Sequence, residues 1–290
     1  MIERTPAIFI AIPFYNCESF LDKAIISVVN QSYKNWKLVL IDDGSTDNSL
    51  SIARKYESDA RIRVISDGLN KGLVTRLNES VSLASGEYYA RMDADDIMHP
   101  MRLEKQIEFL KSHEDIDVLG TSAYTINEND EIQQLILYEK TPIVDPFHPC
   151  FLHPSVMGKI DWFRRNTYSE DFERMEDFEL WLRALNTSHY FNLPLPLMYY
   201  RESGVPIPKK YLATQKSALK LAIRGRAYNL SVGTRFKYFT QTIIKCLVCI
   251  VLGIMKKSEL QIRLRRRNTA AIDINEAQNG LARALSAEII

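Results

Sequence analysis

The sequence lacks the glycine-rich loops that identify the commonest nucleotide-binding proteins. No Gly-x-Gly-x-x-Gly follows the first apolar run, residues 7–13, and no Gly-x-x-x-x-Gly-Lys-Ser/Thr loop occurs anywhere. The first of these loops binds the diphosphate of a dinucleotide, and the second binds the phosphates of ATP or GTP. A Rossmann-type dehydrogenase and a P-loop NTPase are therefore both excluded.

Cysteine is scarce as well. The chain has four, at positions 17, 150, 246 and 249, and they form no disulfide framework. The pair at 246 and 249 lies in an apolar stretch without other metal ligands. This pattern indicates a reducing compartment. No signal peptide precedes the first apolar run, so we expect the chain to stay in the cytoplasm.

What the sequence does contain is a regular alternation of strand-like and helix-like segments. Apolar runs at 7–13, 37–41, 61–66 and 88–92 have the length of buried strands, and residues 19–31 carry apolar side chains at helical spacing. Repeated β-α units predict an α/β fold with a mostly parallel sheet and helices on both faces. With 290 residues, 46% of them hydrophobic, the chain can bury a large core.

Polar motifs follow each of these strands, where the carboxyl ends of parallel strands meet at one rim. The most informative is the segment 93–96, Asp-Ala-Asp-Asp, whose three carboxylates suit a hard divalent cation such as Mg²⁺ or Mn²⁺. Mg²⁺ is commonly held by carboxylates together with the phosphates of a substrate. The alternative is an acidic turn in which Asp96 caps the helix that begins near Pro100.

Six motifs in this order resemble one known family. They are residues 11–16 (AIPFYN), 30–33 (NQSY), 41–47 (IDDGSTD), 70–72 (NKG), 91–96 (RMDADD) and 175–181 (MEDFELW). Together they resemble the inverting family 2 glycosyltransferases of the GT-A fold, of the type that builds bacterial surface polysaccharides. The resemblance covers about residues 6–202.

This resemblance implies a Rossmann-like GT-A catalytic domain over residues 1–202. Its nucleotide-binding half would be about 1–100 and its acceptor half about 101–202. The Gln-x-x-Arg-Trp motif of the processive synthases is missing, since Phe-Glu-Leu precedes Trp181. Transfer of a single hexose or N-acetylhexosamine from a UDP-sugar is therefore expected. The alternatives are a nucleotidyltransferase that makes nucleotide sugars, and a catalytically silent nucleotide-binding scaffold at the membrane.

For the donor, the resemblance points to a set of side chains on the first four loops. They are Pro13, Tyr15, Glu18, Asp42, Asp43, Lys71, Arg76, Asp93 and Ala94, with Asp95 as the ligand of Mn²⁺ or Mg²⁺. A carboxylate among them can accept the N3-H of uracil. The segment 42–45 could instead be a plain polar turn, and Lys71 and Arg76 could be solvated charges.

On the acceptor side, Asp177 is the candidate for the base that deprotonates the incoming hydroxyl, with Glu176 as its neighbour. Two adjacent acids raise one another's pKa. Alternatively, both only favour the start of a helix through its dipole. Asp96, His153 and Trp181 are further candidates for contact with the acceptor or donor sugar, although His153 could be a hydrogen-bonded structural residue.

The last third is different in charge. Residues 201–267 contain sixteen Lys or Arg and two acids, and residues 238–255 are rich in Ile, Leu, Val and Cys. Lys245 interrupts this stretch, and the apolar remainder is too short to span a bilayer of about 30 Å.

We predict that residues 203–267 form a basic amphipathic helical extension on an anionic membrane. The enzyme would then be peripheral on the inner face of the cell membrane, where a polyprenyl-diphosphate-linked saccharide is the expected acceptor. A core helix or a homodimer contact is the alternative, and nucleic acid is not an expected partner. Residues 268–290 are weakly patterned and predicted to be a tail.

Overall fold

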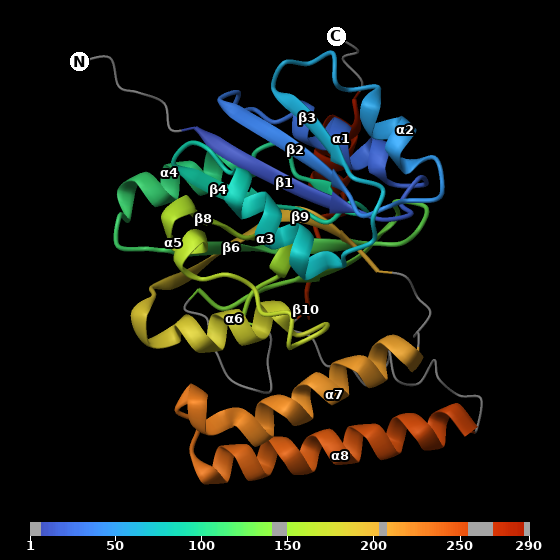
Figure 1. Ribbon diagram of the computed structural model, residues 1–290. Coiled ribbons are helices and arrows are strands. Elements are labelled where there is room, and N and C mark those ends of the chain that lie inside the picture. Colours follow the sequence, from blue (N-terminus) through green and yellow to red (C-terminus); the bar gives the residue numbers. More distant parts are fainter. Residues whose placement is uncertain (1–6, 141–149, 203–207, 255–268, 287–290) are drawn as a thin grey trace.

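A computed structural model describes residues 7–140, 150–202, 208–254 and 269–286 (Figure 1). Its first half is a parallel sheet in the order β3-β2-β1-β4. The strands are β1 (Ile8–Phe14), β2 (Trp36–Asp42), β3 (Ile62–Ser66) and β4 (Tyr88–Arg91), and they alternate with helices α1 (Leu21–Val29), α2 (Ser49–Arg54) and α3 (Leu73–Leu83). The four predicted strands and the helices between them are confirmed.

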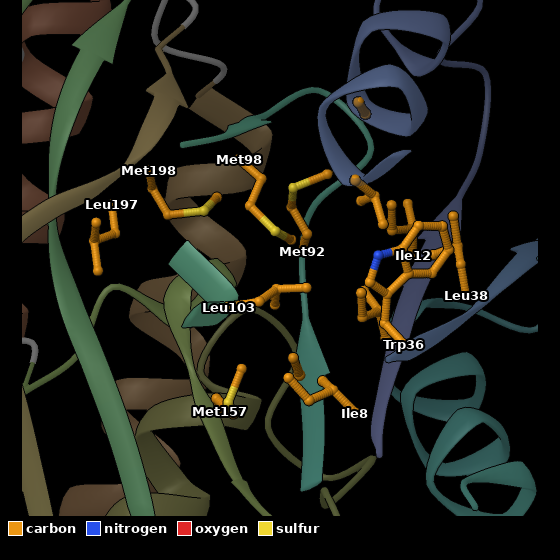
Figure 2. Close-up of a cluster of buried hydrophobic side chains, with 14 of the residues drawn as sticks. Ile8, Ile12, Trp36, Leu38, Met92, Met98, Leu103, Met157, Leu197 and Met198 are labelled. Atoms are coloured by element: carbon orange, nitrogen blue, oxygen red, sulfur yellow. The ribbon is translucent and has the colours of Figure 1, made fainter. Parts of the chain in front are cut away.

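Both faces of this parallel sheet are covered. Every residue of β1 is buried, as its unbroken apolar sequence predicts. Ile8, Ile10 and Ile12 pack into one core cluster, while Phe9 and Ala11 pack into another on the opposite face. The first cluster continues into the second half of the domain, where Met92, Met98, Met157 and Met198 fill the space between strands and α4 (Figure 2). Unbranched methionine side chains suit such an irregular gap.

The second half of the sheet is mixed. It comprises β5 (Ile97–Met98), α4 (Arg102–Ser112), β6 (Val118–Ile126), β7 (Ile132–Ile136), η1 (His153–Ser155), β8 (Met157–Lys159), α5 (Ile160–Arg165), α6 (Glu176–Ala184), η2 (Leu185–Thr187) and β9 (Tyr190–Arg201). β8 runs antiparallel to both β4 and β6, and β7 forms an antiparallel pair with β6. β9 is parallel to β6. The sheet is therefore fully parallel over β1–β4 and mixed beyond β4, where β7 and β8 are antiparallel to their neighbours while β9 is parallel to β6.

The predicted helical extension is present. Helix α7 (Pro208–Arg224), the short η3 (Gly225–Tyr228) and α8 (Val232–Ile254) form an antiparallel hairpin that stacks against α6 (Figure 1). A core cluster joins Phe172, Met175 and Leu182 of the catalytic domain to Leu221 and Tyr238 of the hairpin. Among the described residues, no helix has the length and apolar character needed to span a bilayer. The basic cluster at 256–267 lies outside the described residues.

The prediction of a tail at 268–290 is wrong for residues 269–285. Strand β10 (Thr269–Ala270) pairs with β7 at the edge of the sheet, and α10 (Ile274–Leu285) packs on α1 and β5. The Asp273 side chain caps α10 by accepting a hydrogen bond from the backbone N-H of Glu276. After the hairpin the chain therefore returns to the sheet and to α1.

Candidate functional site

The loops after β1 and β2 interlock at the carboxyl rim of the sheet. Asn16, at a positive φ of 49°, accepts the backbone N-H of Thr46 through its side chain and donates its own N-H to Ser45 Oγ. Glu18 accepts the backbone and side-chain N-H groups of Asn48 at 2.9 and 2.8 Å. Glu18, which the sequence predicts to bind the nucleotide sugar, thus joins the two loops.

Tyr15 and Pro13 differ in how they meet this rim. Tyr15 is 47% exposed, so the phenol is available to stack on a planar ring. Pro13 is buried within β1, in register with Ile41 of β2, and lies in the strand just before the loop that contains Tyr15.

Asp42 and Asp43 are both buried but have different partners. Asp42 accepts the backbone N-H of Ser45 at 2.9 Å and the hydroxyl of Ser66 at 2.8 Å, which closes the turn after β2. Asp43 accepts the backbone N-H groups of Lys71 and Gly72, so it orders the next loop as well. The plain-turn interpretation therefore fits Asp42, while Asp43 links three loops of the rim.

Arg76 has the opposite character to a solvated charge, because its side chain is fully buried. Its Nε donates to Asp43, while the two terminal nitrogens donate to Asp67, Glu79 and the carbonyl of Leu69. These bonds use all five N-H donors of the guanidinium. Among the described residues these partners engage every N-H donor of Arg76, and its predicted contact with the nucleotide sugar stays a prediction. Through Nε, Arg76 positions Asp43.

Lys71 is half exposed and forms an ion pair with Asp67 at 2.6 Å. Hydrogen bonds from Arg76 and Lys71 hold the pKa of Asp67 well below its usual range, so this carboxylate stays ionised. The Lys71 charge is thereby paired within its own loop.

The acidic triplet lies at the end of β4. One oxygen from each of Asp93, Asp95 and Asp96 falls within 4.8 Å of the others, close enough to share one cation. Ala94 is buried and packs into the core beneath them. The predicted metal cluster is therefore assembled by the fold.

Asp96 does not cap the next helix. Its Oδ1 accepts the backbone N-H of Arg201 at 2.8 Å, and α4 begins after Met101 without a side-chain cap. The capping alternative is wrong. Arg201 also donates through Nε to the carbonyl of Asp95 at 2.7 Å and pairs with Asp130, so the last residue of β9 braces the triplet.

The donor set fits a divalent cation. Asp96 Oδ2 is buried and has no hydrogen-bond partner among the described residues, which is costly for a carboxylate unless another group compensates it. Burial and the neighbouring charge of Asp93 raise the pKa of Asp95 to about 6, and burial also raises that of Asp96. Crowded acid groups of this kind are stabilised as carboxylates when a hard cation binds between them.

A second pair of acids opens α6. Glu176 is buried, and burial together with Asp177 raises its pKa to about 7. The Asp177 side chain is 30% exposed, and burial raises its pKa too. Its Oδ2 lies 3.8 Å from Nδ1 of His153. Asp177 therefore combines access to solvent with the raised pKa that a general base needs.

His153 lies beside Asp177, and Trp181 packs against His153. His153 Nε2 and the Tyr168 hydroxyl are hydrogen-bonded at 3.0 Å, and burial lowers the pKa of His153, which keeps the ring neutral. The structural interpretation of His153 is thus the better one. Trp181 is buried, with its ring stacked on Trp162 and its edge against His153. The indole lies in the core, and the expected contact of Trp181 with substrate stays a prediction.

These features agree with the comparison to known sequences. The profile described as "Glycosyl transferase family 2" matches residues 9–176, from β1 to the first residue of α6. EpsE of Bacillus subtilis (strain 168) is 38% identical over 206 residues, which cover 69% of this chain and 74% of EpsE. The chain belongs to glycosyl transferase family 2.

Two further relatives in this family have more descriptive names. The O-antigen biosynthesis glycosyltransferase WbnJ of Escherichia coli is 34% identical over 211 residues, 70% of this chain and 79% of WbnJ. The UDP-Glc:alpha-D-GlcNAc-diphosphoundecaprenol beta-1,3-glucosyltransferase WfgD of Escherichia coli is 29% identical over 180 residues, 62% of this chain and 70% of WfgD. The chain is thus a family 2 glycosyltransferase.

Solved structures show the same fold. The crystal structure of S. aureus TarS 1–349 in complex with UDP-GlcNAc superimposes with a TM-score of 0.64 at 18% identity, covering 96% of this chain and 79% of TarS 1–349. The mannosyltransferase PcManGT from Pyrobaculum calidifontis, in complex with GDP-Man and Mn²⁺, gives a TM-score of 0.60 at 11% identity, covering 97% of this chain and 86% of that protein. The predicted GT-A fold is confirmed.

One residue of this glycosyltransferase site was given no role by the sequence prediction. Arg91, the last residue of β4, is buried, pairs with Asp93, and has an Nε without a partner. Burial raises the pKa of Asp95, Glu176 and Asp177, and the positive charge of Arg91 partly counteracts this rise. Arg91 therefore lies near both the acidic triplet and the acid pair of α6. Its position two residues before Asp93, in the RMDADD motif, is the one sequence feature that could have suggested this.

Proposed function

We propose that this enzyme transfers a single hexose or N-acetylhexosamine from a UDP-sugar to a lipid-linked saccharide during the synthesis of a surface polysaccharide. The names of WbnJ and WfgD support this acceptor class, and the TarS complex with UDP-GlcNAc supports the donor class. Transfer would take place at the inner face of the cell membrane, where a polyprenyl-diphosphate carrier lies.

The acidic triplet would hold Mn²⁺ or Mg²⁺, with Asp95 as the principal ligand and Asp93 and Asp96 beside it. PcManGT, whose structure contains GDP-Man and Mn²⁺, supports this assignment. When bound, such a cation supplies Lewis-acid stabilisation to the departing diphosphate. Arg201 keeps the triplet in place through its bonds to the backbone of Asp95 and to Asp96.

The nucleoside would bind on the rim formed by the first three loops. Tyr15 is exposed there for stacking, and Asp43, held in place by Arg76, would lie beside the base. The exposed Lys71 stands beside this rim as the remaining charge that the donor could meet. Binding at these loops orients the anomeric carbon toward α6.

Asp177 would act as the base. Its carboxylate takes the proton of the acceptor hydroxyl while that oxygen forms a bond to the anomeric carbon, and the bond from this carbon to the UDP oxygen breaks. UDP leaves with the bonding electron pair. A single displacement of this kind inverts the configuration at the anomeric carbon.

The observation that carries this proposal is the pair of separate carboxylate groups on either side of Arg91. The triplet at the end of β4 crowds three acids within 4.8 Å, which suits a cation, while Asp177 stands apart and partly exposed. The Asp93 charge contributes to the raised pKa of Asp177, so the two groups are near neighbours in space. One site thus contains both a cation-binding cluster and a base.

The test is Asp177→Asn, which removes the base but preserves the shape. We expect transfer to fall at least about a hundredfold, with UDP affinity in the presence of Mn²⁺ unchanged. Asp161→Asn is the matched control, because Asp161 is an exposed acid in the first turn of α5, remote from the triplet in its contacts. Full transfer by Asp177→Asn, or loss of UDP binding in a folded variant, would contradict the assignment.

A further inference from the structure

One face of α8 carries a stripe of large apolar side chains exposed to solvent. Val232, Phe236 and Leu247 are 79%, 69% and 57% exposed, and Phe239 and Ile243 lie between them. The spacings of four, three, four and four residues place all five on one side of a helix. We propose that this stripe is a docking surface for an anionic lipid bilayer.

The opposite side of α8 is already occupied by protein. Tyr238 and Thr242 are buried there, and Tyr238 belongs to the core cluster shared with α7 and the segment before α6. Arg235 donates to the carbonyls of Ala222 and Ile223, which ties the start of α8 to the end of α7. The stripe is therefore the outer surface of a folded hairpin, and its exposure does not come from a loose helix (Figure 1).

The charge of the hairpin decides which partner can cover the stripe. Residues 208–254 contain nine Lys or Arg and no Asp or Glu. Lys237 and Lys245 are exposed on α8 itself. A second copy of the hairpin would bring the same positive charge against it, which disfavours a symmetric dimer through this face.

Nucleic acid would complement the positive charge of the hairpin, but it would not bury the apolar stripe, because a phosphate backbone offers no apolar surface for Phe236 and Leu247. An anionic bilayer satisfies both. Its headgroups attract Lys and Arg side chains near the surface. Apolar side chains of an in-plane helix then enter the boundary between headgroups and acyl chains.

The inner side of the same hairpin is bonded to the segment that leads into the base. Ser217 donates to the carbonyl of Glu173 at 2.8 Å, and Lys220 and Arg224 both pair with Asp171. Tyr228 donates to Glu179 of α6 at 3.0 Å. The lipid-facing stripe and Asp177 are thus held in a fixed relation. A bilayer bound to the stripe would present a lipid-linked acceptor to Asp177. This consequence rests on the proposed function, whereas the lipid contact itself does not.

The experiment is co-sedimentation of the full-length enzyme with vesicles of phosphatidylcholine, with or without phosphatidylglycerol. We expect binding to the vesicles that contain phosphatidylglycerol, and at least about tenfold weaker binding by Phe236→Ser/Leu247→Ser. Lys237→Gln/Lys245→Gln should weaken binding to the anionic vesicles alone. Ile274→Ser is the matched control, because Ile274 is 57% exposed on α10 and lies outside the hairpin.

Vesicle binding that is equal for the wild type and Phe236→Ser/Leu247→Ser would overturn the proposal, as would a wild type that sediments with neither kind of vesicle. Light scattering provides the remaining arm. A wild-type dimer that becomes a monomer in this variant, with unchanged vesicle binding, would assign the stripe to a second copy. Hydrolysis of a UDP-sugar without vesicles, measured in parallel, reports the proposed transferase chemistry independently of the lipid contact.

Discussion

At the scale of single residues, Glu176 and Asp177 show how neighbours in sequence acquire different properties. Glu176 is buried beneath the start of α6, and Asp177 reaches the surface of the site beside His153. Burial, and to a smaller extent the charge of Asp177, raises the pKa of Glu176 to about 7. Near neutral pH Glu176 can therefore carry a proton.

This difference predicts a pH dependence of stability. An acid whose pKa is higher in the folded state binds more protons there, so the free energy of unfolding falls as pH rises from about 4.5 to about 7. Glu176→Gln removes this term. We expect the variant to gain stability relative to the wild type over that interval, on the order of 2 kcal/mol at pH 7.5.

Urea unfolding at pH 4.5 and pH 7.5 measures this difference. Glu173→Gln is the control, because Glu173 is exposed just before α6. A difference between Glu176→Gln and the wild type that does not change with pH would contradict the raised pKa.

Residue types were easier to predict from the sequence than residue partners. The acids of the triplet follow an apolar strand, so their location could be predicted from the pattern of the sequence, while Asp177 was indicated by the resemblance of residues 175–181 to the family. Arg76 could not be assigned in this way. Its five hydrogen bonds depend on Asp43, Asp67 and Glu79 meeting in three dimensions, and a sequence does not show which charges become paired.

At the scale of elements, α10 shows how closely a short C-terminal helix can seal a sheet. Ala277, Gly280 and Ala284 are buried on its inner side, and Tyr199 of β9 donates to the carbonyl of Ala277 at 2.9 Å. A Cβ built on Gly280 would lie 2.3 Å from the Tyr199 hydroxyl and 2.9 Å from His99 Nε2. The absence of a side chain at Gly280 therefore permits this contact.

We expect Gly280→Ala to lower the free energy of unfolding by about 1–3 kcal/mol, since the buried Tyr199 ring cannot move aside freely. Gly233→Ala in α8 is the matched control. A Cβ at Gly233 meets only Ser231 Oγ at 3.9 Å, so alanine there should be neutral or slightly stabilising. Thermal unfolding of both variants checks this, and equal melting temperatures would argue against close packing at Gly280.

The tail prediction failed for an identifiable reason. The inner side of α10 uses Ala and Gly in place of large apolar residues, so its hydrophobic pattern is weak although its packing is tight. The capping pair Asp273 and Glu276 was the available sequence feature. The alternating units of β1–β4 have continuous apolar strands, and their prediction was correspondingly accurate.

At the scale of the whole molecule, the acidic triplet brings three carboxylates together, and their mutual repulsion is unfavourable without a cation. Asp96 Oδ2 also has no hydrogen-bond partner among the described residues, so a bound cation would favour the folded state. Ligands that bind only the folded state stabilise it by mass action. The stability of the enzyme should therefore report occupancy of the site.

With Mn²⁺ and UDP at about a hundred times their dissociation constants, we expect the melting temperature to rise by roughly 5 °C. EDTA should abolish the increase produced by UDP, and Asp95→Asn should do the same in the presence of Mn²⁺. Differential scanning fluorimetry measures both, with the Asp161→Asn variant as control. A full increase in EDTA would remove the cation from this part of the site.

Arg201 has a consequence for the molecule as a whole. It ends β9, holds the backbone of Asp95 and the carboxylate of Asp96, and precedes the start of α7 by only a few residues. The guanidinium also pairs with Asp130 in the turn between β6 and β7. Replacing Arg201 would therefore loosen the end of β9, this turn and the acidic triplet together, so that one side chain couples the order of three segments.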